Sequence, residues 1–259
     1  MLGYGAHIVT RADRFGRILE LLARDGSVSV VALAGDLGVS EATVRRDLQL
    51  LGEQRLLERS HGGAVAQGTA HELPVRYRTG RSEEKQRIAR AAAELVEPGM
   101  SVGLNGGTTT TEVARALAAR QDLTVVTNAL NIAVELAVRA NLKLIVTGGV
   151  ARSASYELVG PLADATLQGI YVDLAFVGVD GIDPVHGLTT QNEVEAATDR
   201  ALMARAGRTI VVADASKLGH VAFAFIAALG PVEALLTDSD ADPAAVERLR
   251  AAGLRVTLI

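Results

Sequence analysis

Hydrophobic residues recur every three to four positions in three segments between Arg14 and Leu51, and this spacing predicts three short helices. The first is predicted from about Arg14 to Ala23. Gly26 and Gly38 separate the segments, because glycine commonly ends a helix, and Ser29 and Ser40 are favourable N-caps for the second and third helices. The predicted buried face of the third helix consists of Val44, Leu48 and Leu51. Its predicted outward face consists of Ala42, Arg45, Arg46 and Gln49.

The segment after the third helix is predicted to form a small wing. Leu56 and Leu57 are predicted strand residues, and a Gly-Gly turn follows, flanked by Arg59 and His61. The second and third helices have the layout of a helix-turn-helix, whose second helix lies in the DNA major groove. The arginine and the histidine beside the turn could contact phosphates or the minor groove. An ordinary helical domain or a protein-interaction cap remains the alternative that periodicity alone leaves open.

Beyond the wing, apolar strands alternate with helices. Residues 67–82 are rich in Gly, Pro and polar residues without a period, which predicts a linker, and a helix is predicted from Ser82 to a stop at Pro98-Gly99. Strands are predicted at 101–104, 123–127, 142–147, 174–179, 209–213, 234–237 and 256–259, and helices at 110–119, 129–139, 193–206 and 244–252. Continuous apolar strands of this kind are typical of a mostly parallel sheet covered by helices, so the predicted fold class is α/β.

Composition and charge narrow the choice of partners. The 259 residues carry a net charge of −4, so any DNA affinity has to come from the local placement of arginines and helix ends. The chain has no Cys, which excludes disulfides and thiolate metal sites and fits a cytoplasmic location. We expect no signal peptide and no membrane span. No metal and no cofactor are expected, because the histidines lack metal-ligand spacing and no dinucleotide motif is present.

The segment GLNGGTTTTEVARAL, residues 103–117, predicts an anion site where a strand passes into a helix. Two glycines allow a tight turn, the threonines supply hydroxyls, and the new helix offers N–H groups at its positive end. This arrangement suits a phosphate, and a turn without a ligand is the alternative. The predicted ligand residues in this segment are Asn105, Gly106, Gly107, Thr108, Thr109 and Thr110.

Further loops at strand ends predict one shared crevice. In an open parallel sheet, ligands bind at the carboxyl ends of the strands. Lys217 could supply a positive charge for a phosphate, and Glu195 could bind sugar hydroxyls. Taken singly, each of these loops is compatible with an ordinary turn. The other predicted ligand residues are Thr127, Asn128, Gly148, Gly149, Asp180 and Gly181.

The segment SEATVRRDLQLLGEQRLLERSHGGAV, residues 40–65, resembles the amino-terminal domain of the DeoR family of bacterial transcriptional regulators. In that family an S-x-x-T-[IV]-R-R-D-L helix is followed by R-x-H-G-G-A. The resemblance implies a winged helix-turn-helix that acts mostly as a repressor. It also implies that Thr43, Arg45 and Arg46 make most of the DNA contacts, with Ser40 at the helix start and His61 in the wing. We interpret Asp47 as a member of an ion pair within the helix.

The loops of the second half are similar to those of the same family. Its sensor domain carries six short motifs, and this chain has them in the same order as GGTT, TNALNIA, GG, FVGVDGI, GLTT and DASKLG. That sensor shares its fold with ribose-5-phosphate isomerase, and the resemblance implies a phosphorylated sugar or related metabolite as effector. Many relatives have Asp in place of Asn105 and Lys in place of Asp199. We therefore assign no ligand contact to Asp199.

These inferences predict a DNA-binding domain at 11–66, a linker at 67–82, and an effector-binding and oligomerisation domain at 83–259. The predicted function is transcriptional regulation, as a repressor of sugar-metabolism genes that responds to a phosphorylated sugar. Predicted partners are double-stranded operator DNA, the effector and further copies of the chain as a dimer or tetramer, because one recognition helix reads few base pairs. The alternative is a sugar-phosphate isomerase with a helical cap, which leaves the Arg45-Arg46 face without a purpose.

Overall fold

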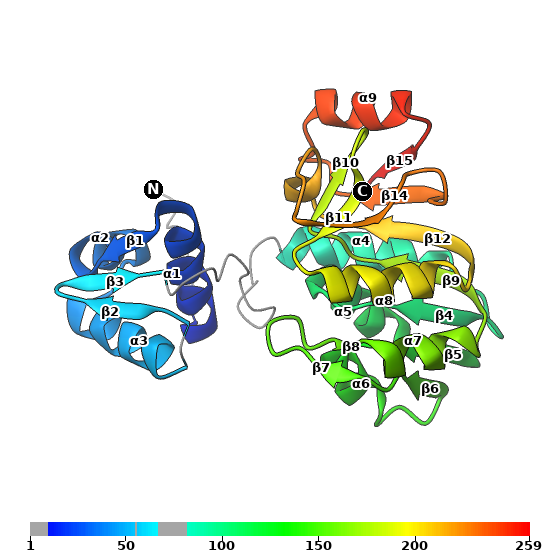
Figure 1. The fold of residues 1–259 in the computed structure, drawn as a ribbon, viewed down its shortest axis with the longest axis horizontal. Coiled ribbons are helices and arrows are strands. Elements are labelled where there is room, and N and C mark those ends of the chain that lie inside the picture. The colour runs from blue at the N-terminus through cyan, green and yellow to red at the C-terminus, as the bar shows by residue number, and fades with distance from the viewer. Residues whose placement is uncertain (1–9, 55, 67–81) are drawn as a thin grey trace, which may run out of the picture. The chain divides into compact units, whose positions relative to one another are not determined.

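The structure is a computed structural model that describes residues 10–54, 56–66 and 82–259. The chain forms two compact units, Met1–Gly80 and Arg81–Ile259, which are described separately below (Figure 1). Nearly all of the predicted linker, residues 67–81, lies outside the described residues. Among the described helices, none has both the length and the apolar character needed to cross a lipid bilayer.

The first unit contains three helices and a three-stranded antiparallel sheet. Its helix α1 (Arg11–Asp25) begins earlier than predicted because Thr10 and Asp13 form a capping box, in which each side chain accepts the other residue's backbone N–H. The sheet has the strand order β1-β3-β2. The remaining elements are β1 (Ser27–Ser29), α2 (Val30–Leu37), α3 (Glu41–Glu53), β2 (Glu58–Ser60) and β3 (Gly63–Val65). Strand β1 was not predicted, because three residues are too few to show an alternating pattern.

The hairpin of β2 and β3 is a wing, but Leu56 and Leu57 are not part of its strands. Strand β2 begins at Glu58, and Leu57 is buried in the helical core of the unit. The Leu57 side chain packs in that core, and the strand begins at the next residue. Gly63 has to be a glycine, since a Cβ there would lie 2.0 Å from the carbonyl oxygen of Val28 on β1. The wing therefore packs closely on the strand that connects α1 to α2.

An ion pair joins α1 to α3. Asp47 is buried, and its carboxylate accepts hydrogen bonds from the Arg14 guanidinium at 2.7 and 3.1 Å. The prediction of an ion pair within the helix is therefore wrong. Asp47 lies on the same face of α3 as Val44, Leu48 and Leu51, which are buried, so its carboxylate meets a neighbouring helix instead of an arginine of its own helix.

The second unit is built on a seven-stranded parallel sheet with the order β15-β14-β12-β9-β4-β5-β6. Its strands are β4 (Ser101–Leu104), β5 (Leu123–Thr127), β6 (Leu142–Val146), β9 (Val172–Val177), β12 (Ala206–Val212), β14 (Ala234–Thr237) and β15 (Arg255–Leu258). Its helices are α4 (Ser82–Glu94), α5 (Thr108–Leu117), α6 (Leu130–Leu136), α7 (Pro161–Gln168), α8 (Glu193–Met203) and α9 (Pro243–Ala251). The predicted α/β class with a parallel sheet is confirmed.

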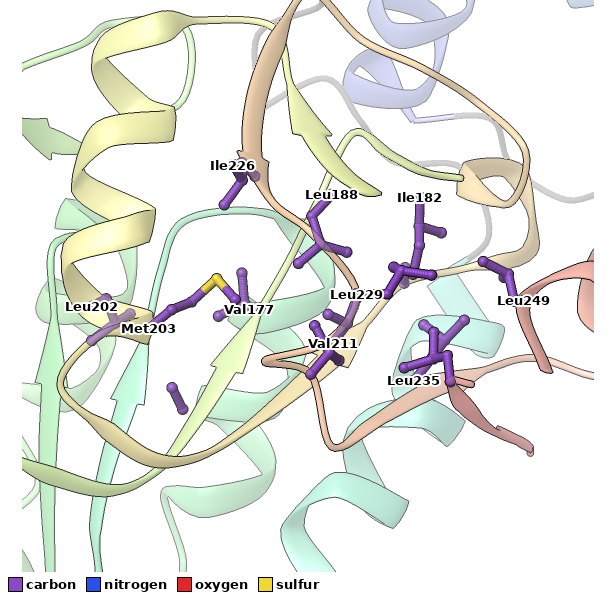
Figure 2. Close-up of a cluster of buried hydrophobic side chains, with 14 of the residues drawn as sticks. Val177, Ile182, Leu188, Leu202, Met203, Val211, Ile226, Leu229, Leu235 and Leu249 are labelled. Atoms are coloured by element: carbon purple, nitrogen blue, oxygen red, sulfur yellow. The ribbon is translucent and has the colours of Figure 1, made fainter. Parts of the chain in front are cut away.

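Successive residues of the central strands enter two different cores. Leu174 and Phe176 of β9 pack in a cluster with residues of α4, α5 and α6. Ala175 and Val177, one position along, pack in a second cluster with residues of α8 and α9, part of which is shown in Figure 2. Because both sides of these central strands are largely buried, their sequences are mostly apolar, and a strand was predicted at or near each of the seven positions.

Several short elements were not predicted. They are β7 (Val150–Ala151), β8 (Leu158–Val159), α7, β10 (Gly181–Asp183), β11 (Gly187–Thr190), β13 (Ala224–Ala227) and a 3-10 turn at Ala215–Lys217. Strands β7 and β8 pair as a small antiparallel ladder, and β10, β11 and β13 form a separate three-stranded antiparallel sheet. Strands β7, β8 and β10 have only two or three residues, too few to develop a periodicity that would distinguish them from loops.

Candidate functional site

The first candidate site is the outward face of α3. The Ser40 hydroxyl caps the helix by accepting the Thr43 N–H at 3.2 Å, and it also bonds the Thr43 hydroxyl at 2.9 Å. The predicted solvent exposure of this face is confirmed, and the exposed residues are Ala42, Arg45, Arg46 and Gln49. Their contact with DNA stays a prediction.

The two arginines of this face differ in their partners. Arg45 donates to Glu41, one turn earlier, at 2.7 Å, and Gln49 donates to Glu53 at 3.0 Å. The Arg46 side chain makes no hydrogen bond or ion pair with any residue in the described part of the chain. Its exposed guanidinium is therefore the side chain on this face that is most available to a phosphate or a base edge.

The wing presents further polar groups. Arg59 lies on β2 and His61 in the turn that follows, and both are exposed. Gly62 completes this turn with a φ of +82°, a conformation that residues with a Cβ rarely adopt. The turn therefore has a fixed shape, and it displays the two basic side chains that were predicted for it.

The second candidate site lies where neighbouring strands of the sheet end. Strands β9, β4 and β5 are adjacent, so the loops that follow them lie side by side. Asn105, after β4, is buried, and its amide group donates to the Gly178 carbonyl at 3.0 Å and accepts the Gly178 N–H at 2.8 Å. The loops after β4 and β9 therefore meet, as the sequence predicts.

Four acidic side chains from three segments surround this junction: the residue before β8, the loop after β9, and α8. We call Glu157, Asp180, Glu195 and Asp199 the carboxylate cluster. Asn105 donates to Asp199 at 3.1 Å, and Asn128 donates to Glu157 at 3.2 Å. The Thr190 hydroxyl donates to Asp180 at 3.0 Å and lies 3.5 Å from Glu195. Asp199, to which the sequence analysis gave no place, is thus in direct contact with a predicted ligand residue.

Burial and mutual repulsion favour the protonated form of part of this cluster. Burial raises the pKa of Asp199 to about 8; the charges of Glu195 and Asp180 act in the same direction, and the hydrogen bond from Asn105 opposes them. Burial, together with the charges of Asp199 and Glu195, raises the pKa of Glu157 well above its usual range. Arg152 contacts the cluster through an ion pair of 2.5 Å with Glu195. Shifted carboxyl groups gathered in this way are frequent where proteins bind ligands, and they also occur in structural networks.

The loop between β4 and α5, where an anion site was predicted, leads into a helix start without a side-chain cap. Gly107 precedes α5 with a φ of +128°, and no side chain caps this helix. The hydroxyls of Thr110 and Thr111 donate to the Gly107 carbonyl at 3.1 and 2.6 Å, so the protons of both hydroxyls are already used in hydrogen bonds within the loop. In the described part of the chain, the hydroxyls of Thr108 and Thr109 make no hydrogen bond. Those two threonines are the ones that can offer their hydroxyls to a ligand.

Glu157 lies against this same loop. A Cβ on Gly106 would lie 2.2 Å from Oε1 of Glu157, so the glutamate side chain packs directly on the Gly106 backbone. Glu157 precedes β8 and is 5% exposed. A negatively charged or protonated carboxyl group of the chain itself therefore lies beside the predicted anion site.

Four of the predicted ligand residues shape the surrounding backbone. The Thr127 hydroxyl accepts the Ala129 N–H at 3.1 Å. A Cβ on Gly149 would lie 2.8 Å from the backbone of β8, and one on Gly181 would lie 2.3 Å from the His220 carbonyl. Gly148 packs near α7. These glycines permit close backbone contacts and contribute no side chain to the carboxylate cluster.

Two lysines lie near the segment that follows β12, and only one of them was predicted. Lys217 ends the 3-10 turn after β12, and its ammonium forms no ion pair with the described residues. Lys85 of α4 is buried, and its Nζ lies 3.8 Å from Asp214, directly after β12. The sequence held a signal for Lys85, which shares a helix face with the buried Ile88 and Ala89, where a charged residue is unusual. We find no comparable signal for Glu157.

Comparison with family models covers both units. The description "DeoR-like helix-turn-helix domain" applies to residues 14–69, and "DeoR C terminal sensor domain" applies to residues 81–239. The second of these matches alone spans more than half of the chain.

Similar proteins are found along nearly the full length. The chain is 37% identical to the HTH-type transcriptional regulator GlpR of Haloferax volcanii, over 95% of this chain and 96% of that protein. It is 34% identical to the glycerol-3-phosphate regulon repressor of Escherichia coli K12, over 88% of this chain and 91% of that protein. Among solved structures, a ribose 5-phosphate isomerase A from Methanocaldococcus jannaschii matches 51% of this chain and 52% of its own, at 22% identity and a TM-score of 0.39. By the two family models and the full-length relatives, the protein belongs to the DeoR family of transcriptional regulators.

Proposed function

We propose that this protein represses transcription by binding operator DNA, and that a phosphorylated sugar or a related metabolite controls that binding. The observation that carries the proposal is the exposed face of α3, where two arginines and small polar residues follow a capped helix start beside a wing. This is the geometry in which a recognition helix enters the major groove. A relative named as a glycerol-3-phosphate regulon repressor supports a small phosphorylated effector.

In this proposal the DNA contacts are divided between helix and wing. Arg46 contacts base edges or phosphates in the major groove, together with Ser40, Ala42, Thr43, Arg45 and Gln49 from the same helix. Arg59 and His61 reach a neighbouring phosphate or the minor groove. The first 66 residues carry as many acidic as basic residues, so affinity depends on these few positions rather than on overall charge.

The effector is proposed to bind where β9, β4 and β5 end. Its phosphate would rest on the backbone N–H groups that follow Gly106 and Gly107 and on the Thr108 and Thr109 hydroxyls, with Thr110 shaping the loop and Lys217 as the predicted cation. Its hydroxyl groups would meet Asn105, Asn128, Asp180 and Glu195. Because the Glu157 carboxyl packs on Gly106, an anion at this loop has to displace that side chain or meet it in the protonated form.

The remaining parts of the proposal concern coupling and assembly. The effector must bind two states of the protein with different affinities if it is to change DNA binding. We propose that the chain works as a homo-oligomer in the cytoplasm, since two helices reading two half-sites give the specificity that one lacks. We also propose that the second unit binds its ligand without converting it.

The DNA part is tested by a gel shift at fixed salt with promoter fragments from beside the gene. We expect Arg46→Ala to lower affinity by roughly 10–100-fold, the usual effect of losing one base or phosphate contact. The matched control is Arg24→Ala, which removes an exposed arginine of the same unit from the end of α1. Equal affinities of the two variants would show that the recognition face is placed wrongly.

The effector part is tested with Gly107→Asp. This change puts a negative charge at the start of α5, and we expect it to abolish release from DNA by sugar phosphates while DNA binding without effector is kept. The control is Gly253→Asp, because Gly253 also has a positive φ, of +91°, and has open space around it. Purified protein that ignores promoter DNA but interconverts pentose phosphates would support the isomerase alternative instead.

A further inference from the structure

The segment Val221–Ile226 is apolar at every position, yet its burial alternates. Ala222, Ala224 and Ile226 are buried, whereas Val221, Phe223 and Phe225 are 43%, 80% and 54% exposed. Figure 2 shows Ile226 within the same buried cluster as Leu188. A strand that is apolar on both faces is typical of a sheet covered on both sides. Among the described residues of one chain, only the inner face of this segment is well covered.

The chain uses phenylalanine sparingly and otherwise buries it. It has four Phe residues, of which Phe15 and Phe176 lie in the cores of the two units at 4% and 0% exposure. The other two are Phe223, directly before β13 (Ala224–Ala227), and Phe225 on β13. Both are exposed and the intervening Ala224 is buried, so they lie on the same outer side. A contiguous exposed patch of large apolar side chains indicates a surface that is covered in the working protein.

We propose that this surface is where a second copy of the chain packs. We call Val221, Phe223 and Phe225 the β13 face. The inference rests on the proposed homo-oligomer and names its contact surface. Residues 221–229, VAFAFIAAL, contain no charged side chain, so the β13 face can meet its own copy across a two-fold axis without repulsion between like charges.

The size of the patch fits the centre of a dimer interface. A phenylalanine buries about 150–250 Å² when it is covered, so the exposed parts of the two rings would remove roughly 250 Å² per protomer from water. A stable interface buries about 800 Å² per partner, and a few central aromatic residues commonly dominate its affinity. Arg200 donates to the Phe225 carbonyl, so this backbone acceptor is already used and the partner packs on the side chains.

The first test compares two double variants of the full chain by light scattering after gel filtration, over a range of concentrations. Phe223→Asp with Phe225→Asp places charges on the β13 face, and we expect its self-association to weaken by about 100-fold or more. The control combines Val134→Asp on α6 with Val138→Asp in the turn after it, and these side chains are 73% and 80% exposed. We expect the control to assemble like the unmodified chain.

The second test uses the absence of cysteine from the sequence. Single variants Phe223→Cys and Phe225→Cys are treated with a short bis-maleimide, and we expect covalent dimers, with none from Val134→Cys. The β13 face is supported if the folded Phe223→Asp, Phe225→Asp variant associates more weakly, or if Cys at position 223 or 225 cross-links two chains. It is overturned if neither result is obtained. An unmodified chain that stays monomeric overturns the oligomer itself, and DNA binding is measured separately by gel shift.

Discussion

Replacing Asp199 by Asn removes an acid that is costly to ionise, and this predicts a change in how stability depends on pH. Asp199 is buried, and its Oδ1 accepts the Asn105 amide at 3.1 Å. Asparagine has nearly the same shape and keeps an acceptor oxygen for this bond. The charged or titratable groups that act on the carboxyl are Glu157, Glu195, Asp180 and the opposing Arg200.

The sign and size of the effect come from the raised pKa of Asp199. In the folded protein this pKa is about 8, against 3.8 for the ordinary group, so the folded state holds a proton that the unfolded chain releases. The stabilisation that this carboxyl group contributes is fully present below its pKa in the unfolded chain, 3.8. It is lost as the pH rises to and through its pKa in the folded protein, about 8. Between about pH 5.5 and pH 8 the loss is on the order of 3 kcal/mol, at about 1.4 kcal/mol per pH unit. Asp199→Asn carries no charge, so it removes this loss.

The measurement is thermal unfolding of the full chain and the variant across that pH range. At about 2–4 °C per kcal/mol for a domain of this size, we expect the fall in Tm of the unit to be smaller by roughly 6–12 °C in Asp199→Asn. Asp122→Asn serves as the control, because Asp122 is exposed and its replacement leaves the buried cluster intact. Parallel pH profiles for the chain and the Asp199 variant would refute the argument that burial holds a proton on this carboxyl.

Three further predictions concern the wing, the helix contact and the anion loop. Gly63→Ala places a Cβ 2.0 Å from the Val28 carbonyl, so we expect unit one to lose about 2 kcal/mol or more by denaturant unfolding and to lose operator binding; normal operator affinity would contradict the wing packing. Asp47→Ala leaves the Arg14 guanidinium without this carboxylate and is expected to cost about 3 kcal/mol in the same assay, whereas a loss below about 1 kcal/mol would mean that the pair contributes little. Glu157→Gln keeps the side chain beside Gly106 neutral at every pH, so at a pH high enough to ionise Glu157 the variant is expected to bind inorganic phosphate roughly tenfold more tightly than the unmodified chain, as followed by the ligand-induced rise in Tm; equal affinities at that pH would separate Glu157 from the anion loop.

Periodicity was sufficient for the elements that bury a full face. The helix α3 is amphipathic, so the spacing of Val44, Leu48 and Leu51 fixed which residues point outward, and the exposed arginines followed from it. The central strands of the parallel sheet are largely buried on both sides, so they are mostly apolar. Strands β4, β5 and β14 have the predicted ends, whereas the β7–β8 ladder and the small sheet of β10, β11 and β13 went unpredicted.

The contacts between segments far apart in sequence could not be read from the chain. The ion pair of Asp47 with Arg14, the bond of Asn105 to Asp199 and the packing of Glu157 on Gly106 each join residues more than 30 positions apart, and no local pattern encodes them. The wrong ion pair for Asp47 comes from reasoning along a single helix, and Asp199 was left out because it departs from the pattern of the family that the chain resembles. Lys85 was recoverable, because a lysine on an apolar helix face already indicates a buried partner.

The sequence by itself determined the class of the fold, the location of the turns and the outward face of α3, because hydrophobic spacing and glycine positions act over a few residues. The tertiary structure decided which side chains form the site at the strand ends. The order β9-β4-β5 brings their loops together, and burial there raises the pKa of two carboxyl groups, Glu157 and Asp199. Proximity in space and the removal of water set the chemistry of such a group, and both exist only after the chain has folded.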